Sequence, residues 1–148
     1  MLSKSYKMSI ETKQAEIIEE FSMFDEWMEK YEYIIELGRE LPLIEEQYKS
    51  QDNLIKGCQS QVWLHAEMDA KNKVQFSADS DAIITKGIIS MLVRVLTDST
   101  PEEIIHADLH FINDIGLHEH LSPTRSNGLL AMIKQMKYYG LAIQAKKG

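Results

Sequence analysis

The spacing of apolar residues changes from helical to alternating and back again along this chain, and that change limits the folds it can adopt. In residues 10–38, 81–96 and 123–143, apolar side chains recur every three to four positions, as on the buried face of an amphipathic helix. Residues 54–78 instead hold short runs in partial alternation, which is typical of strands. A few strands between helical segments predict an α+β fold, in which helices pack on a small antiparallel β-sheet.

Three short strands are expected in the middle segment, at residues 54–56, 61–68 and 74–78. The polar stretch 69–73 is typical of a turn, so the strands are expected to form an antiparallel meander. Cys58 then falls in the bend that joins the first strand to the second.

Capping residues and glycines set the expected ends of two helices. Asp25 is expected to begin the second helix, and Gly38 to end it in the left-handed conformation. Asp79 or Ser80 is expected to cap the strongly apolar helix over residues 81–96.

Two segments that contain proline predict further helix starts. The segment Thr100–Glu103 has the N-cap, the N1 proline and the third-position glutamate of a capping box. Ser122 and Pro123 begin a long final helix, whose basic end over residues 141–148 is expected to fray.

Composition and charge indicate one globular domain and disfavour some classes of partner. A chain of 148 residues with 44% hydrophobic residues fits a single domain over residues 1–148. Its 16 basic residues are outnumbered by 23 acidic ones, and the net charge of −7 disfavours a nucleic-acid partner.

No apolar run reaches the ~20 residues of a membrane span, so no membrane partner is expected. Residues 1–8 lack the apolar stretch of a signal peptide and are expected to form a ragged start in a cytoplasmic protein.

Cys58 is the single cysteine, so the chain can form neither an intramolecular disulfide nor a metal site from its own thiolates alone. Free cysteines are most often buried as small apolar residues, which is one interpretation of Cys58. Its neighbours Gly57, Gln59 and Ser60 are not those of a core cysteine, however. The second interpretation is a nucleophilic thiolate, whose pKa a positive group or backbone donors would have to lower.

Neither a histidine base for Cys58 nor a metal site has strong support in the sequence. His65 is the closest histidine in sequence, but along an extended strand it lies at least ~10 Å from the bend. His118 and His120 flank Glu119 without the helical spacing of metal ligands, so no metal site is expected.

Charged residues near two helix starts have a structural and a functional interpretation. Arg125 falls in the first turn of the final helix, where the macrodipole disfavours a cation by about 0.3–1 kcal/mol. An ion pair with a surface carboxylate and a functional role both fit this position. Asp79 and Asp81 bracket a strand-to-helix junction, where helix capping and contact with a partner are the two interpretations.

Four segments of the chain carry a resemblance to a known family. They are Tyr31–Gly38 followed by Leu41-Pro42, then Gly57-Cys58-Gln59-Ser60-Gln61-Val62-Trp63-Leu64, then Asp79-Ser80-Asp81-Ala82 with Lys86-Gly87, and finally Leu121-Ser122-Pro123-Thr124-Arg125-Ser126-Asn127-Gly128-Leu129. In content and order these segments resemble the SufE family of sulfur-acceptor proteins, which includes CsdE. The resemblance covers residues 24–140.

The resemblance implies an α+β fold shared with iron–sulfur scaffold domains of the NifU type, and a role in sulfur transfer. In the family, the cysteine at the position of Cys58 takes sulfane sulfur from a PLP-dependent cysteine desulfurase of the SufS or CsdA type. It passes the sulfur to an iron–sulfur cluster scaffold such as SufB. The chain would then stimulate the desulfurase without being an autonomous enzyme, and it would need no cofactor because the PLP belongs to the partner. Homodimers occur in the family, so a homodimer is one expected state.

The resemblance also suggests which residues surround the active cysteine. Gly57, Gln59 and Ser60 adjoin it in the family motif. Asp81 and Arg125 match family positions that engage the partner or form the environment of the cysteine.

Two other classes of function stay open on the sequence. An interaction module without chemistry would keep its function in a Cys58→Ser variant. A cysteine-dependent hydrolase would need a histidine within ~3–4 Å of the sulfur and would turn over without a partner.

Overall fold

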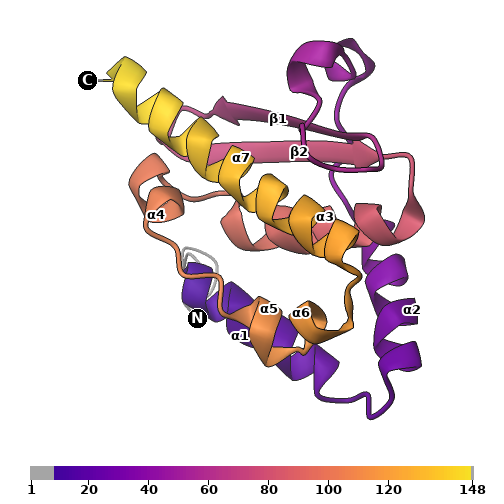
Figure 1. The fold of residues 1–148 in the computed structure, drawn as a ribbon. Helices are drawn as coiled ribbons and strands as arrows, with labels where there is room; N and C mark the ends of the chain where they lie inside the picture. Colours follow the sequence, from indigo (N-terminus) through magenta and orange to yellow (C-terminus); the bar gives the residue numbers. More distant parts are fainter. Residues whose placement is uncertain (1–8, 148) are drawn as a thin grey trace.

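The computed structural model describes residues 9–147, which form seven α-helices, two strands and two short 3-10 helices (Figure 1). In chain order these are α1 (Ile10–Phe21), α2 (Trp27–Gly38), η1 (Glu46–Tyr48), η2 (Gln51–Asn53), β1 (Val62–Met68), β2 (Val74–Ser80), α3 (Ile83–Leu96), α4 (Pro101–Ile105), α5 (Phe111–Asp114), α6 (Leu117–His120) and α7 (Pro123–Lys147). The α+β class predicted from the sequence is confirmed. The ragged start expected at residues 1–8 lies outside the described residues.

Helix α3 is the centre of the fold because it contacts β2 of the sheet and the helices α1, α2 and α7. In Figure 1 α3 lies below the sheet, α1 and α2 lie lower in the view than α3, and α7 crosses in front. The sheet turns one face to this core, so Val62, Leu64 and Phe76 are buried. Tyr139 of α7 donates a hydrogen bond to the backbone oxygen of Leu64 at 3.3 Å, which holds α7 across β1.

The sheet has two strands, and the third strand predicted at residues 54–56 is wrong. Leu54 makes a single antiparallel bridge to Trp63, and the Ile55 amide donates to the Val62 oxygen at 2.8 Å. The chain then turns out of the sheet, so no ladder follows. The strands β1 and β2 pair antiparallel along their full length, as the meander required.

Helix α2 differs from the prediction at both ends. Glu26, rather than Asp25, is its N-cap residue. Gly38 is the last helical residue and Arg39 follows with a right-handed φ of −72°, so the predicted left-handed ending is wrong. The glycine serves packing instead, because a Cβ at Gly38 would lie 3.0 Å from the backbone nitrogen of Gly87 in α3. The two helices therefore cross at close range.

The start of α3 also differs from the prediction that Asp79 or Ser80 caps it. The N-cap residue is Ala82, and the Ser80 hydroxyl accepts from the Ala82 amide at 3.2 Å without reaching into the helix. The Asp79 carboxylate pairs instead with Lys49 at 2.7 Å and with Lys86 at 3.4 Å. Asp79 therefore ties three segments of the chain together and caps none of the helices.

The predicted starts of α4 and α7 are confirmed. The Thr100 hydroxyl accepts from the Glu103 amide at 3.1 Å, and the Glu103 carboxylate accepts from the Thr100 amide at 2.8 Å. The Ser122 hydroxyl accepts from the Arg125 amide at 3.2 Å. Helix α7 continues to Lys147, so the structure is helical where fraying was expected. No helix in residues 9–147 is long and apolar enough to cross a membrane.

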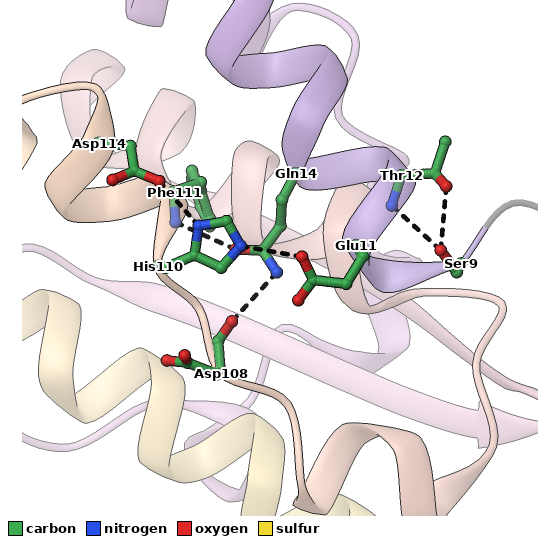
Figure 2. Close-up of polar contacts among 8 residues, drawn as sticks. All are labelled: Ser9, Glu11, Thr12, Gln14, Asp108, His110, Phe111 and Asp114. Atoms are coloured by element: carbon green, nitrogen blue, oxygen red, sulfur yellow. Dashed lines mark hydrogen bonds and ion pairs between the residues drawn. The ribbon is translucent and has the colours of Figure 1, made fainter.

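A buried amide fastens α1 to the loop before α5 (Figure 2). The Gln14 side chain donates to the Asp108 oxygen at 3.1 Å and accepts from the Phe111 amide at 3.0 Å. Both polar ends of this fully buried side chain are therefore satisfied, which a buried amide requires.

An exposed histidine adds a second, pH-dependent tie at the same junction, where His110 lies between Glu11 of α1 and Asp114 of α5 (Figure 2). The hydrogen bond to Asp114, followed by that to Glu11, raises the pKa of His110 above its ordinary value of 6.5. Charged His110 therefore stabilises the fold fully below about pH 6.5, and this contribution is lost as the pH rises through the raised pKa. For exposed pairs we expect at most about 1 kcal/mol.

Urea unfolding of the wild type and of His110→Asn, at pH 5.5 and at pH 9, measures this effect. We expect the stability difference between the two proteins to be larger at pH 5.5. A difference that is equal at the two pH values would contradict the assignment.

Candidate functional site

The loop over residues 56–61 carries Cys58 and is closed at its base. The hydrogen bond from the Ile55 amide to the Val62 oxygen, 2.8 Å long, joins its two ends. The Gln61 amide donates to the Asp81 carboxylate at 3.0 Å, and the Asp81 amide donates to the Gln61 oxygen at 3.2 Å. Asp81 therefore fixes the end of the loop against the start of α3.

Gly57 turns the loop so that Cys58 faces α7. Its φ of 97° lies in the left-handed region, which side chains with a Cβ rarely adopt. A Cβ at this position would also lie 3.2 Å from the Cβ of Ala131 in α7. Both the conformation and the close approach require glycine immediately before the cysteine.

The thiol of Cys58 lies against the backbone of α7, where it donates a hydrogen bond to the Gly128 oxygen at 3.5 Å. Cys58 is half-buried beside a small pocket of about 80 Å³, here called the thiol pocket. The lining residues of the thiol pocket are Cys58, Gln59, Ser60, Thr85, Ile88, Thr124, Arg125, Gly128 and Met132. The loop, α3 and α7 each contribute to it.

Arg125 is the charged residue of the thiol pocket, and none of the other lining residues is a histidine or a carboxylate. Its side chain is exposed and forms no ion pair with any carboxylate in residues 9–147, which removes the interpretation as a surface ion pair. Arg125 lies in the first turn of α7, whose macrodipole also favours negative charge. The lining of the thiol pocket therefore includes one cationic residue and no histidine or carboxylate that could act as a general base.

The structure brings together most of the residues predicted for the site. Cys58, Gln59, Ser60 and Arg125 line the thiol pocket, and Gly57 shapes the loop beside it. Asp81 does not line the pocket and acts on the loop through Gln61 instead.

His65, the nearest histidine in sequence, lies outside the thiol pocket. It bonds Glu67 at 2.9 Å and stacks on Tyr48, with ring centroids 3.6 Å apart. Among residues 9–147, no group of three or more His, Cys, Asp or Glu side chains is placed to hold a metal ion.

Five residues of the thiol pocket were missed by the sequence analysis, and they are Thr85, Ile88, Thr124, Gly128 and Met132. Gly128 carried a usable signal, because a glycine inside a long helix costs about 1 kcal/mol relative to alanine and needs a reason. A Cβ there would make an ordinary contact with the Cys58 sulfur at 3.5 Å, so the glycine marks where α7 lies against the thiol without being required for the close approach. The remaining four are ordinary residues of a helix face and carried no such signal.

Burial raises the pKa of the Cys58 thiol above its usual range, so less thiolate is present at neutral pH in the folded protein. Alkylation by iodoacetamide, followed as a function of pH, measures this pKa because the thiolate is the reacting form. We expect the rate of the folded protein to reach half its maximum at a higher pH than that of the protein unfolded in urea. The same midpoint, or a lower one, in the folded protein would contradict the burial of the thiol.

Two comparisons with known proteins concern the fold and the family of this chain. The chain is similar to a hypothetical protein from Thermus thermophilus whose structure was solved in solution, with a TM-score of 0.74 over 90% of this chain and 96% of that one. At 19% identity this likeness supports the fold. Residues 15–139 match the family described as SufE, Fe-S metabolism associated domain. The chain therefore belongs to the SufE family and is associated with Fe–S metabolism.

Proposed function

We propose that this protein accepts sulfane sulfur on Cys58 from the persulfide of a PLP-dependent cysteine desulfurase and delivers it to an iron–sulfur cluster scaffold. Membership in the SufE family supports the association with Fe–S metabolism. The observation that carries the finer proposal is a lone thiol beside a pocket whose lining includes Arg125 and no general base. The donor is a desulfurase of the SufS type and the acceptor a scaffold of the SufB type.

Sulfur transfer of this kind needs one thiolate on the chain. The Cys58 thiol first releases its proton, and the resulting thiolate attacks the outer sulfur of the donor persulfide. A sulfur–sulfur bond forms on Cys58, the sulfur–sulfur bond of the donor breaks, and the donor cysteine leaves as a thiolate that takes up a proton. Atoms and electrons balance without an oxidant, a reductant or a metal ion.

The thiol pocket fits the product of this step. A cavity with a volume of roughly 10–15 Å³ holds one water molecule. The volume of the thiol pocket is about 80 Å³. The outer sulfur of a Cys58 persulfide therefore has room beside the thiol. The persulfide is anionic near neutral pH, and we expect Arg125, which lines the same pocket, to stabilise its charge.

The absence of a second cysteine protects the carried sulfur. A neighbouring thiol on the same chain would attack the persulfide, form a disulfide and release the sulfur as sulfide. Cys58 is the single cysteine of the sequence, so this loss cannot occur within one chain. The half-buried position of Cys58 also restricts attack by thiols from solvent.

A desulfurase assay tests the proposal. A purified PLP-dependent cysteine desulfurase of the SufS type is given cysteine, and the release of alanine is measured with and without this protein. We expect the protein to raise the rate, because transfer to Cys58 clears the donor cysteine for the next turnover. The protein alone is expected to hydrolyse no ester substrate, since no histidine lines the thiol pocket. An unchanged alanine rate with several such desulfurases would overturn the proposal.

A further inference from the structure

A long groove of about 690 Å³ runs along α7 beside the Cys58 loop. We call it the α7 groove, and its lining residues are Gln51, Asp52, Leu54, Lys56, Asn127, Leu130, Ala131, Lys134, Gln135 and Tyr138. Ala131 is the residue that Gly57 approaches, and Asn127 precedes the glycine that accepts the thiol hydrogen bond. The α7 groove therefore begins next to the thiol pocket and leads away from it.

The helix wall of the α7 groove exposes apolar side chains. Leu130 is 58% exposed and Tyr138 is 60% exposed, although most large apolar residues of the chain are buried. Leu141, which is 52% exposed, continues the same helix face at helical spacing. Tyrosine is enriched among the residues that carry most of the binding energy of an interface, and the exposed leucines beside it supply apolar area that a partner can bury.

The charge of the groove is opposite to that of the protein. From residue 121 to the end, the sequence has no acidic residue, whereas the whole chain has a net charge of −7. Lys56 and Lys134 are exposed on opposite walls of the groove, and Asp52 is the single carboxylate among its lining residues. Lys137 of α7 is turned away, because it donates to the Ala107 oxygen at 2.7 Å.

We propose that the α7 groove binds an acidic segment of the desulfurase, with apolar residues among its carboxylates, while the donor persulfide sits at Cys58. Lys56 and Lys134 would pair with carboxylates of that segment, and Leu130 and Tyr138 would cover its apolar side chains. The α7 residues that line the groove, from Asn127 to Tyr138, span about three helical turns or ~17 Å, which suits an extended polypeptide better than a small ligand. The inference rests on the proposed function, because the desulfurase is the partner that must reach Cys58.

Charge reversal with a matched control tests the inference. The test variant is Lys56→Glu/Lys134→Glu, and the control is Lys71→Glu/Lys73→Glu, which makes the same change of charge. The control lysines lie in the turn between β1 and β2. Because β1 is seven residues long, they are about 20 Å along the strand from the Cys58 loop. The readout is the rate at which a SufS-type desulfurase with cysteine adds sulfur to Cys58.

We expect the test variant to be loaded about tenfold more slowly than the wild type at low salt, and the control within about twofold. Added NaCl should slow the wild type more than the test variant, because screening removes an attraction that the variant has lost. Iodoacetamide, a neutral reagent that modifies the Cys58 thiolate without a protein partner, should alkylate all three proteins at rates within about twofold.

A second pair of variants tests the apolar part of the surface. Leu130→Ser/Tyr138→Ser should slow desulfurase loading several-fold. The control, Met23→Ser/Met28→Ser, changes side chains that are 71% and 66% exposed on another surface, and it should not slow loading.

Equal loading of the test and control charge variants would overturn the inference while the loaded wild type still supports the proposed function. If the apolar pair slowed loading and the lysine pair did not, the acidic character of the segment would be wrong. If no SufS-type desulfurase loaded the wild type, the proposed function would fail and this inference with it.

Discussion

The Gly87→Ala variant is expected to lose about 1–3 kcal/mol of unfolding free energy, as is typical when a packed core is overfilled. A Cβ at this position would lie 2.1 Å from the backbone oxygen of Ile34 and 2.7 Å from the Ile34 carbonyl carbon. Because these atoms belong to the backbone of α2, the overlap can be relieved only if the two helices move apart. The helix propensity of alanine, about 1 kcal/mol better than that of glycine, offsets part of this cost.

Gly128→Ala is the matched control, since it also changes a glycine inside a helix. Its new Cβ would lie 3.5 Å from the nearest atom, which is an ordinary contact. We therefore expect Gly128→Ala to be as stable as the wild type or more stable, while Gly87→Ala unfolds at a lower urea concentration. Similar urea midpoints for Gly87→Ala and the wild type would show that α2 and α3 do not cross as closely as the structure has them.

Cys58→Ser is expected to lose all stimulation of the desulfurase, so that alanine release falls to the rate of the desulfurase alone. The hydroxyl that replaces the thiol is not ionised near neutral pH and cannot carry a sulfane sulfur. The fold should persist, with a change in unfolding free energy of about 1 kcal/mol or less, because the hydroxyl can still donate to the Gly128 oxygen.

Cys58→Ala separates the loss of the thiol from any effect of the hydroxyl, and it should lose stimulation equally. Circular dichroism spectra and urea midpoints near those of the wild type would show that both variants are folded. Stimulation that survives in either folded variant would favour an interaction module in which Cys58 only packs.

The starts of α4 and α7 could be predicted from the sequence because their signals are local. The capping box at Thr100 and the hydroxyl cap at Ser122 each satisfy backbone groups within a few residues, so no distant part of the chain decides them. The role of Gly38 could not be predicted from its neighbours in the sequence. Its function is to let α2 meet Gly87, and that depends on a helix much later in the sequence.

The strand predicted at residues 54–56 failed for a similar reason. A strand is defined by the partner that continues its ladder, and Leu54 finds one bridge to Trp63 before the chain turns away. Asp79 has the residue type and position of a helix cap, yet two lysines from other segments, Lys49 and Lys86, hold its carboxylate.

In the candidate site, too, some residues could be predicted from the local sequence and others only from the folded chain. Cys58 could be singled out from its neighbours and Arg125 from its place in the first turn of a helix, and the resemblance to a family linked the two residues, which lie on different elements. The α7 groove escaped the sequence analysis, although the lack of acidic residues after position 121 was a visible signal. Its second wall, at Lys56, could not be seen because only the folded loop brings that residue opposite Lys134.

The intact mass of the purified, reduced protein after incubation with a SufS-type desulfurase and cysteine tests the central claim most directly. We predict that the protein gains the mass of one sulfur atom, that a thiol reductant removes it, and that peptide mapping places it on Cys58. If the folded protein, with its thiol still titratable, gained no sulfur from any of several such desulfurases, Cys58 would not be a sulfur acceptor.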